Sequence, residues 1–438
     1  MYYGIDLGTT NSLIGSGEKL YSGLVSSSVD VAEKKQVSRD TVGDSIVSSY
    51  KVNMTTGNEG QLSVECSSVI LRDLADRASK ESGEEVKDVV ISVPAKFTHT
   101  QRQAVCNAAT KANLNPVGLI NEPTAAAIWV CRNVKDLVAV YDLGGGTFDV
   151  SIVDTRAGSY FVVASEGLIL AGDDFDKAIV DDIYDTCKVK LRYRGKVLKK
   201  KLLAEARKAK EAMQKNGCDY KIPLDEYGLP GQDYVFTLDT YKVLMKSTFA
   251  KTIALTNHLV ECYWGTSDAP KIVFVGGSTA CPYLKEWVCQ STGLKEVKCD
   301  DQPDYIVAKG VALYAEMLFN GTAEREVDDI TKRLCIEDEL GMSITIVEKN
   351  SIIPTSATIS VSNNQRSKTL ELNLYQGDAL VCRENDYIGT LVYEYDEVKE
   401  AGQGFVEVEV TINRDGIISL KGTDILTCME QSVELTVR

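Results

Sequence analysis

Along the first two-thirds of the chain, short apolar runs alternate with stretches whose apolar residues recur at helical spacing. Val86–Val93 and Lys271–Val275 have the pattern of buried strands. Helices are predicted over His99–Ala112, Phe175–Val189, Lys201–Met213 and from the capping residue Thr237 toward Cys262. This alternation of strand and helix is typical of an α/β domain.

After Phe319 the helical spacing gives way to strict alternation. Apolar residues from Leu370 to Leu374, and again from Val406 to Ile412, occupy every second position, and Asp415-Gly416 is a hairpin signal before another apolar run. Residues 335–438 are therefore predicted to form an antiparallel β-sandwich with one buried and one wet face. The preceding stretch, 323–334, is strongly charged and is predicted to be a linker, which leaves residues 1–322 as the α/β domain.

A glycine-rich loop occurs twice in that α/β domain, as Asp6-Leu-Gly-Thr-Thr-Asn-Ser12 and as Asp142-Leu-Gly-Gly-Gly-Thr-Phe-Asp149. Each copy follows an apolar run and leads into another, which predicts a β-hairpin whose tip exposes backbone N–H groups. Such tips bind phosphate, because glycine permits the close backbone approach that points several N–H groups at one anion. A single Asp-Leu-Gly could be an ordinary tight turn. The repeat in matching settings favours a phosphate site between two lobes of similar architecture.

Side chains in the two loops suit a metal-bound phosphate. Thr9, Thr10 and Thr147 add hydroxyl donors. Asp6 and Asp142 lead the loops, and carboxylates of this kind suit a Mg²⁺ ion that keeps most of its waters while bridging to phosphate oxygens.

Composition excludes several other classes of function. The chain has 438 residues, 44% of them hydrophobic, and a net charge of −15, which disfavours nucleic-acid binding by bulk electrostatics. Its 12 cysteines include no C-x-x-C pair and it has only two histidines, so structural zinc is not expected. No apolar run is long enough for a membrane span, and Met1 leads directly into a predicted core strand, leaving no room for a signal peptide. We therefore expect a cytoplasmic protein with buried, unpaired thiols.

Five strings, in this order, resemble the 70-kDa heat-shock chaperone family, the DnaK-like proteins within the actin and sugar-kinase superfold. They are GIDLGTTNS from Gly4, VVISVPAKF from Val89, INEPTAAA from Ile120, YDLGGGTFDVSI from Tyr141 and VGGST from Val275. The resemblance covers nearly the whole chain, more weakly from about Lys19 to Ser63 and in the sandwich. It implies an actin-like ATPase domain of two ribonuclease H-like lobes, followed by a shortened substrate-binding sandwich without a helical lid.

The resemblance also implies roles for individual residues. Nucleotide-binding positions are Gly8, Thr9, Thr10, Asn11, Gly144, Gly145, Thr147, Gly172, Lys210, Gly276, Gly277, Ser278 and Asp304, with Asp6 and Asp142 ordering the waters around Mg²⁺. Catalytic positions are Lys51, Glu122, Asp142, Thr147 and Asp149. Lys51 would stabilise charge on the γ-phosphate, while Glu122 and Asp149 would orient or deprotonate the attacking water.

The activity implied is slow, Mg²⁺-dependent hydrolysis of ATP to ADP, coupled to binding of unfolded or client polypeptides in protein folding and the stress response. Leu370, Leu372 and Val406 match the family's peptide cleft, although alternating apolar residues also form plain sandwich core. A J-domain co-chaperone and a nucleotide exchange factor are implied partners. Pro94, Arg102 and Glu122 would link the γ-phosphate to the domain surface.

Several residues depart from the family pattern. Glu211 and Ala280 stand where two arginines usually enclose the adenine, and Arg207 replaces a glutamate, which predicts an i,i+4 pair between Arg207 and Glu211. ATP binding is then expected to be weaker and less selective. The linker, Asp328-Asp-Ile-Thr-Lys-Arg-Leu334, lacks the family's run of leucines, so docking by apolar burial is expected to be weak. No lid follows the last predicted strand, so a captured peptide is expected to leave quickly.

Two alternatives remain open. A nucleotide-sensing interaction or assembly protein with little turnover would account for the altered base pocket and the polar linker. A small-molecule kinase on the same superfold would need a polar substrate pocket between the lobes, and it gives no reason for the attached sandwich.

Overall fold

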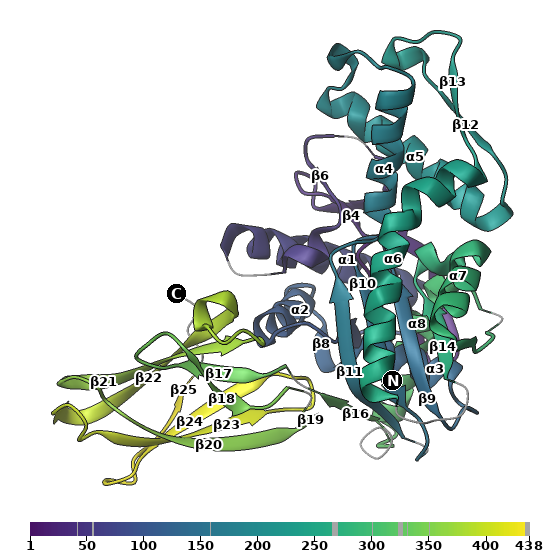
Figure 1. The fold of residues 1–438 in the computed structure, drawn as a ribbon. Coiled ribbons are helices and arrows are strands. Elements are labelled where there is room, and N and C mark those ends of the chain that lie inside the picture. The colour runs from purple at the N-terminus through teal and green to yellow at the C-terminus, as the bar shows by residue number, and fades with distance from the viewer. Residues whose placement is uncertain are drawn as a thin grey trace.

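Two mixed β-sheets form the centre of the α/β region in this computed structural model (Figure 1). The structure describes residues 1–41, 43–54, 57–157, 159–264, 270–299, 301–322, 327–330, 332–349 and 351–433. The first sheet has the order β3-β2-β1-β7-β8, and the second contains β11-β10-β9-β14-β15 in the corresponding order. In both sheets the central hairpin, β1–β2 or β9–β10, has one more antiparallel strand on one side, β3 or β11. On its other side two strands are added in parallel, β7 and β8 or β14 and β15.

The strands of these two sheets have the following bounds. The first sheet consists of β1 (Tyr3–Leu7), β2 (Asn11–Ser16), β3 (Lys19–Ser26), β7 (Asp88–Val93) and β8 (Asn115–Asn121). The second contains β9 (Leu137–Leu143), β10 (Phe148–Asp154), β11 (Tyr160–Leu168), β14 (Lys271–Val275) and β15 (Lys295–Glu296). Both glycine loops therefore lie at hairpin tips, as the sequence predicts, and the strand predicted over Lys271–Val275 has those bounds.

Helices cover these sheets and fill the space between them. They are α1 (Gly57–Ser82), α2 (His99–Lys111), α3 (Glu122–Val130), α4 (Gly172–Thr186), α5 (Lys196–Asn216), α6 (Leu238–Tyr263), α7 (Pro282–Thr292) and α8 (Pro303–Phe319). Apolar residues of α1 and α2 pack on the first sheet, and those of α4 to α7 pack on the second. A third cluster joins α3 and α8 to valines of β7, β9 and β14, so these two helices lie between the sheets. Thr98 and Thr237 cap α2 and α6 with their hydroxyl groups.

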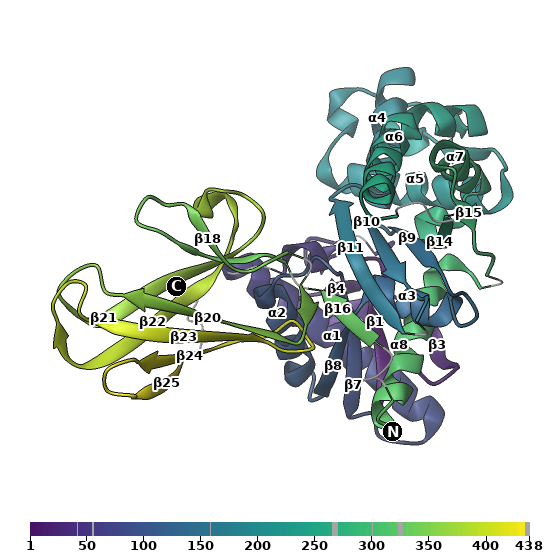
Figure 2. The same cartoon turned by 60° about the horizontal axis from the view of Figure 1, so that its bottom comes forward.

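Smaller elements complete the α/β region. A three-stranded sheet contains β4 (Ser28–Asp30), β5 (Lys35–Val37) and β6 (Ile46–Val47), and a hairpin pairs β12 (Tyr220–Pro223) with β13 (Asp233–Phe236). Single 3₁₀ turns are η1 (Tyr50–Asn53), η2 (Leu191–Tyr193), η3 (Asp225–Tyr227) and η4 (Gly277–Ala280). Figures 1 and 2 show α4 and α5 at the end of the molecule away from the C-terminal strands, and Figure 1 shows α6 running from there along β10 and β11.

The C-terminal strands form two four-stranded antiparallel sheets around a common apolar core. One sheet contains β17 (Leu334–Glu337), β18 (Ser343–Val347), β21 (Ser367–Gln376) and β22 (Asp386–Lys399), with η5 (Cys382–Glu384) before β22. The other contains β20 (Thr355–Ser362), β23 (Phe405–Ile412), β24 (Ile418–Asp424) and β25 (Glu430–Val433). Alternate residues of β23 are buried, as the period-two pattern predicts.

The predicted linker is not simply a connector. Its residues 327–330 form β16 (Val327–Ile330), which pairs in parallel with β11 and antiparallel with β19 (Ile352–Ile353). Backbone hydrogen bonding needs no apolar side chains, so a charged segment can still add a strand to the second sheet. Backbone hydrogen bonds therefore attach this segment to the second sheet, although it lacks the family's run of leucines. Residues 323–326 and 331 of the predicted linker lie outside the described part of the chain.

Close contact between α8 and α3 depends on glycine at position 310. A Cβ atom there would lie 1.8 Å from the carbonyl oxygen of Ala125. We expect Gly310→Ala to lower the free energy of unfolding by about 1–3 kcal/mol, because the helices must separate to admit the methyl group. Urea denaturation measures this change. Gly23→Ala on β3, where a Cβ would meet nothing within 4 Å, is the control, and equal stability of the two variants would contradict the expectation.

Candidate functional site

The tips of the two glycine hairpins face each other across one cleft. Gly8, Thr9, Thr10 and Asn11 from the β1–β2 hairpin and Gly144, Gly145 and Thr147 from the β9–β10 hairpin line it. A Cβ on Gly145 would lie 1.9 Å from Oγ1 of Thr10, so the tips can approach this closely only with glycine at that position. The predicted phosphate-binding loops are thus brought together.

Four further elements close the cleft around these tips. Gly172 and Asp173 of α4 donate backbone N–H groups to the carbonyls of Gly144 and Gly145, at N···O distances of 3.1 and 2.7 Å. Lys210 of α5 donates from Nζ to the carbonyl oxygen of Gly172 at 2.8 Å, and Ser278 of η4 donates to that of Gly144 at 2.9 Å. The cleft is also lined by Gly276 and Gly277 at η4 and by Asp304 at the start of α8.

Carboxylates crowd the floor of the cleft. Asp6 ends β1, Asp142 lies at the end of β9, and Glu122 is the first residue of α3. Burial raises the pKa of Asp6 to about 7, and repulsion from Glu122 adds to the effect. The pKa of Asp142 is raised well above its usual range, first by burial and then by Glu122, Asp149 and Asp6. These groups lie close enough to compete for one proton or one cation.

Lys51 is the cation that partly balances this floor. It is buried in η1, and its Nζ lies 2.6 Å from Oε1 of Glu122. Asp6 also accepts a hydrogen bond from the hydroxyl of Ser92 at 2.8 Å. The ammonium group of Lys51 therefore lies in the cleft with the two glycine loops, although the sequence around Lys51 resembles the family only loosely.

Asp149 is the second residue of β10, just after the second hairpin tip. Burial raises its pKa to about 6, against the attraction of Lys96 and a hydrogen bond from Thr147. The Lys96 ammonium donates to the carbonyl oxygen of Gly167 at 2.7 Å, which holds it beside β10. Asp149 also lines a second cavity of about 520 Å³ that shares Thr9, Lys51 and Thr147 with the cleft.

The donor set suits a hydrated ion better than a fully protein-bound one. In the described ranges no group of three or more His, Cys, Asp or Glu residues is arranged to hold a metal ion. Mg²⁺ commonly binds through one or two carboxylates while retaining waters and taking phosphate oxygens as ligands. Asp6 and Asp142 fit that role, because a nearby divalent cation would favour the ionised carboxylates that burial and the charge of Glu122 disfavour.

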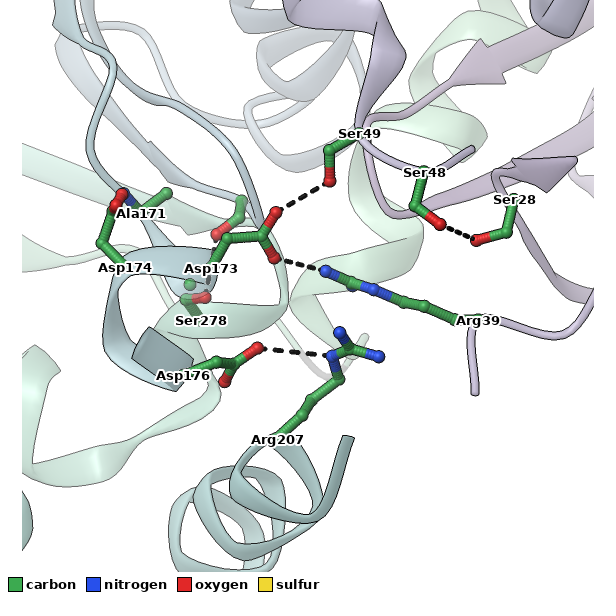
Figure 3. Close-up of polar contacts among 12 residues, drawn as sticks. Ser28, Arg39, Ser48, Ser49, Ala171, Asp173, Asp174, Asp176, Arg207 and Ser278 are labelled. Carbon is green, nitrogen blue, oxygen red and sulfur yellow. Dashed lines mark hydrogen bonds and ion pairs between the residues drawn. The ribbon is translucent and has the colours of Figure 1, made fainter. Parts of the chain in front are cut away.

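Two arginines near the mouth of the cleft were not predicted as part of the site (Figure 3). Arg39, in the loop after β5, lines the cleft and forms an ion pair with Asp173 of α4, which also accepts a hydrogen bond from Ser49 at 2.7 Å. No motif surrounds Arg39, and it lies in the stretch where the family resemblance is weakest. Its role follows only from the contact across the cleft.

The predicted pair between Arg207 and Glu211 is wrong. Arg207 instead has its Nε 3.3 Å from Asp176 and its Nη1 3.7 Å from Asp40, and in the described part of the chain it forms no ion pair with Glu211. Glu211 lines the cleft, where it adds to the effect of burial in raising the pKa of Asp304. Ala280 is exposed and is not among the residues that line this cleft. Glu211 and Asp304 thus place two carboxylates in the same part of the cleft.

A family model described as Hsp70 protein matches residues 23–438 of the chain. The chain belongs to the Hsp70 family. Membership supports a nucleotide-binding function of the chaperone type, and members of the family are in general Mg²⁺-dependent ATPases that bind client polypeptides. The strand orders of the sheets and the sandwich are compatible with an Hsp70 ATPase region followed by a β domain.

The sandwich of this Hsp70 member has a hollow lined by strands of both of its sheets. Leu370 and Leu372 line the hollow, which measures about 600 Å³, together with Ile336, Ile344 and Val361. Its rim is acidic, with Glu337, Asp338, Glu339 and Glu371. Val406 is fully buried opposite Val361 in the sandwich core and does not line the hollow. Two of the three predicted peptide-contact residues therefore meet there.

The sandwich also contacts α2 beside the cleft. The guanidinium of Arg102 donates to the backbone carbonyl of Asp415 at 3.1 Å and to the side chain of Asn121 at 2.6 Å. Asp415 accepts the backbone N–H of Leu119 at 2.7 Å through its carboxylate. Lys332 and Asp386 line the second cavity that reaches Lys51 and Asp149. The sandwich and the cleft floor are thus separated by few residues.

No helix among the described residues is both long and apolar enough to cross a lipid bilayer.

Buried His99 makes the contact between α2 and the sandwich sensitive to pH. Its Nδ1 accepts the backbone N–H of Ile418 at 2.9 Å, and burial lowers its pKa from 6.5 to about 4. The unfolded chain binds this proton between pH 6.5 and 4 and the folded protein does not, so the stabilising effect is complete above pH 6.5 and falls on acidification. We expect wild-type thermal stability to fall more between pH 7 and 5 than that of His99→Gln, whose side chain does not titrate.

The exposed His258 on α6 provides the matched control for this measurement. His258→Gln is expected to keep the wild-type pH dependence. Parallel stability curves for wild type and His99→Gln would contradict the assignment.

Proposed function

We propose that this Hsp70-family chain binds ATP with Mg²⁺ between the two hairpin tips, hydrolyses it slowly, and couples nucleotide state to binding of client polypeptides by the sandwich. The observation that carries the proposal is the meeting of both phosphate loops, the Lys51–Glu122 pair and the carboxylates Asp6 and Asp142 in one cleft. We further propose a two-lobed ATPase domain over 1–322, a connecting segment over 323–334 and a substrate domain over 335–438. The repeated strand order of the two sheets supports the two lobes.

Backbone N–H groups of the two tips would hold the phosphates, with the hydroxyls of Thr9, Thr10 and Thr147 as additional donors. Oγ1 of Thr10 is buried without a hydrogen-bond partner, which suits a group reserved for a ligand. Gly172, Gly276, Gly277 and Ser278 leave room for the rest of the nucleotide. Bound Mg²⁺ would neutralise phosphate charge, with Asp6 and Asp142 orienting its waters.

Lys51 would stabilise the charge that develops on the transferred phosphoryl group. Its ammonium is held by Glu122, so little reorganisation is needed when substrate binds. Asp149 would orient the attacking water and accept its proton. With a pKa raised to about 6 it remains mostly ionised at neutral pH and yet is basic enough for this role.

A short chain of contacts would carry the state of the cleft to the sandwich. Arg102 bonds both Asn121 and Asp415, and Asn121 immediately precedes Glu122. A shift of Glu122 toward or away from Lys51 would therefore move Asn121, and with it the arginine that touches the sandwich hairpin. Hydrogen-bonded pairing of β16 with β11 gives a second connection between the same parts. A J-domain co-chaperone and an exchange factor remain proposed partners by family membership.

Single-turnover hydrolysis of ATP tests the enzymatic part of the proposal. We expect Lys51→Ala to slow the chemical step by about a hundredfold or more, because it removes a preorganised cation from the γ-phosphate. Lys208→Ala, on the exposed part of α5, should match wild type. Equal rates for wild type and Lys51→Ala would instead favour a nucleotide-sensing protein with little turnover, the reading that the carboxylates of Glu211 and Asp304 in the cleft support.

Fluorescence anisotropy with a hydrophobic heptapeptide tests the sandwich. We expect weak, rapidly exchanging binding that Leu372→Asp abolishes, because a carboxylate would enter the apolar part of the hollow. Thr358→Asp places the same charge on the other sheet, at an exposed position of β20, and should leave binding intact. An unchanged signal up to millimolar protein, or equal loss in both variants, would contradict this assignment.

A further inference from the structure

A cluster of charges at the mouth of the cleft is not used by the functional roles described so far. Arg39 comes from the loop after the small sheet and reaches α4, while Arg207 comes from α5 and reaches Asp176 on the same helix α4 (Figure 3). Burial lowers the pKa of the Arg39 guanidinium, and repulsion from Arg207 lowers it further. Two cations are thus held close together beside the phosphate loops.

The Arg39 guanidinium lies directly against the second hairpin tip. Its Nη1 is 3.7 Å from the point that a Cβ on Gly145 would occupy, and Arg39 lines the cleft together with Thr10. Its partner Asp173 is tied to the same tip, because the backbone N–H of Asp173 donates to the carbonyl oxygen of Gly145 at 2.7 Å. Asp173 therefore holds the arginine at the point where the two phosphate loops meet.

Both arginines have donors without acceptors. Among the described residues, Arg39 makes its hydrogen bond through Nη2 to Asp173, and Nε and Nη1 make none. Nη1 of Arg207 is buried and has no hydrogen-bond partner, although a carboxylate oxygen of Asp40 lies 3.7 Å from it. The Arg39 side chain is only 14% exposed, so water does not fully compensate its charge. An anion bound in the cleft, which Arg39 lines, would give its unpaired Nη1 an acceptor.

We propose that Arg39 contacts phosphate oxygens of the bound nucleotide, an inference that rests on the proposed nucleotide-binding function. The planar guanidinium fork suits phosphate, and its unpaired Nη1 already faces the loop that would hold that phosphate. Asp173 pairs with Arg39 in the absence of phosphate and so competes with phosphate for the guanidinium. Arg39 thereby supplies a cation to nucleotide in a cleft whose base end bears Glu211 in place of an arginine.

Calorimetric titration of the full chain with ATP and with adenosine, both in the presence of Mg²⁺, tests this contact. Arg39→Gln is expected to weaken ATP binding about tenfold or more, as for loss of a charge-assisted hydrogen bond, and to leave adenosine binding unchanged. Asp173→Asn removes a carboxylate that competes with phosphate for Arg39, so it should bind ATP at least as tightly as wild type. Ser49→Ala removes only the other hydrogen bond to Asp173 and should match wild type within about twofold.

The outcomes separate this inference from the function on which it rests. If wild type binds ATP and Arg39→Gln binds it equally well, the contact is refuted and the nucleotide site stands. If Arg39→Gln and Asp173→Asn lose ATP and adenosine binding to the same extent, the ion pair only holds the two sides of the cleft together and the inference is overturned. If wild type binds no ATP, the proposed function and the inference fail together.

Arg39→Lys keeps the positive charge and its pairing with Asp173 should Arg39→Gln fail to fold. It loses the planar fork, so a loss of ATP affinity smaller than about tenfold but measurable, with adenosine binding intact, supports the contact. ATP affinity equal to that of wild type in a folded Arg39→Lys protein, together with weakened ATP binding by Asp173→Asn, would overturn it.

Discussion

A buried group of carboxylates balanced by too few cations is the constraint on which the rest of the structure depends. Asp6, Glu122 and Asp142 share one cleft floor with Lys51, and Asp149 lines the adjoining cavity. Burial, and then repulsion between these carboxylates, raises the pKa values of the three aspartates. Such a cluster is costly unless a cation joins it. Strands β1 and β9 end at this point, and each delivers one aspartate directly before a glycine turn. The electrostatic deficit and the glycine tips therefore lie in the same place.

The cleft is not isolated from the C-terminal sandwich. Arg102 contacts both the residue before Glu122 and the β23–β24 hairpin, and a second cavity extends from Lys51 and Asp149 to Lys332 and Asp386. Only a few contacts thus separate the charged groups of the cleft floor from residues that contact the sandwich. The contacts of Arg102 are polar and partly buried, so breaking them leaves donors and acceptors without full access to water.

Two departures from the family pattern, Arg207 and Glu211, lie on α5 beside the cleft. Glu211 adds to the burial that raises the pKa of Asp304, while Arg207 pairs with Asp176 and Asp40, and Arg39 with Asp173. On the sandwich, the hollow lined by Leu370 and Leu372 keeps apolar walls inside an acidic rim.

Sequence alone determined the local elements and the loops at their ends. Apolar runs of period two, helical spacing and glycine-rich turns predicted the hairpins, β14, α2, α6 and the sandwich strands, because each of these patterns reflects backbone geometry over a few residues. The position of Glu122 was predicted from a string that is continuous in the chain, and that of Lys51 from a stretch that resembles the family only loosely. No such pattern indicated α1 or the small sheet that carries Arg39.

Only the tertiary structure decided which partner each charge takes: Arg207 binds Asp176 instead of Glu211, and Arg39 reaches Asp173 across the cleft. It also decided that Val406 packs in the core and that a charged segment becomes strand β16. These outcomes depend on distances between elements far apart in the chain, and charge and hydrophobicity at a single position do not encode such distances.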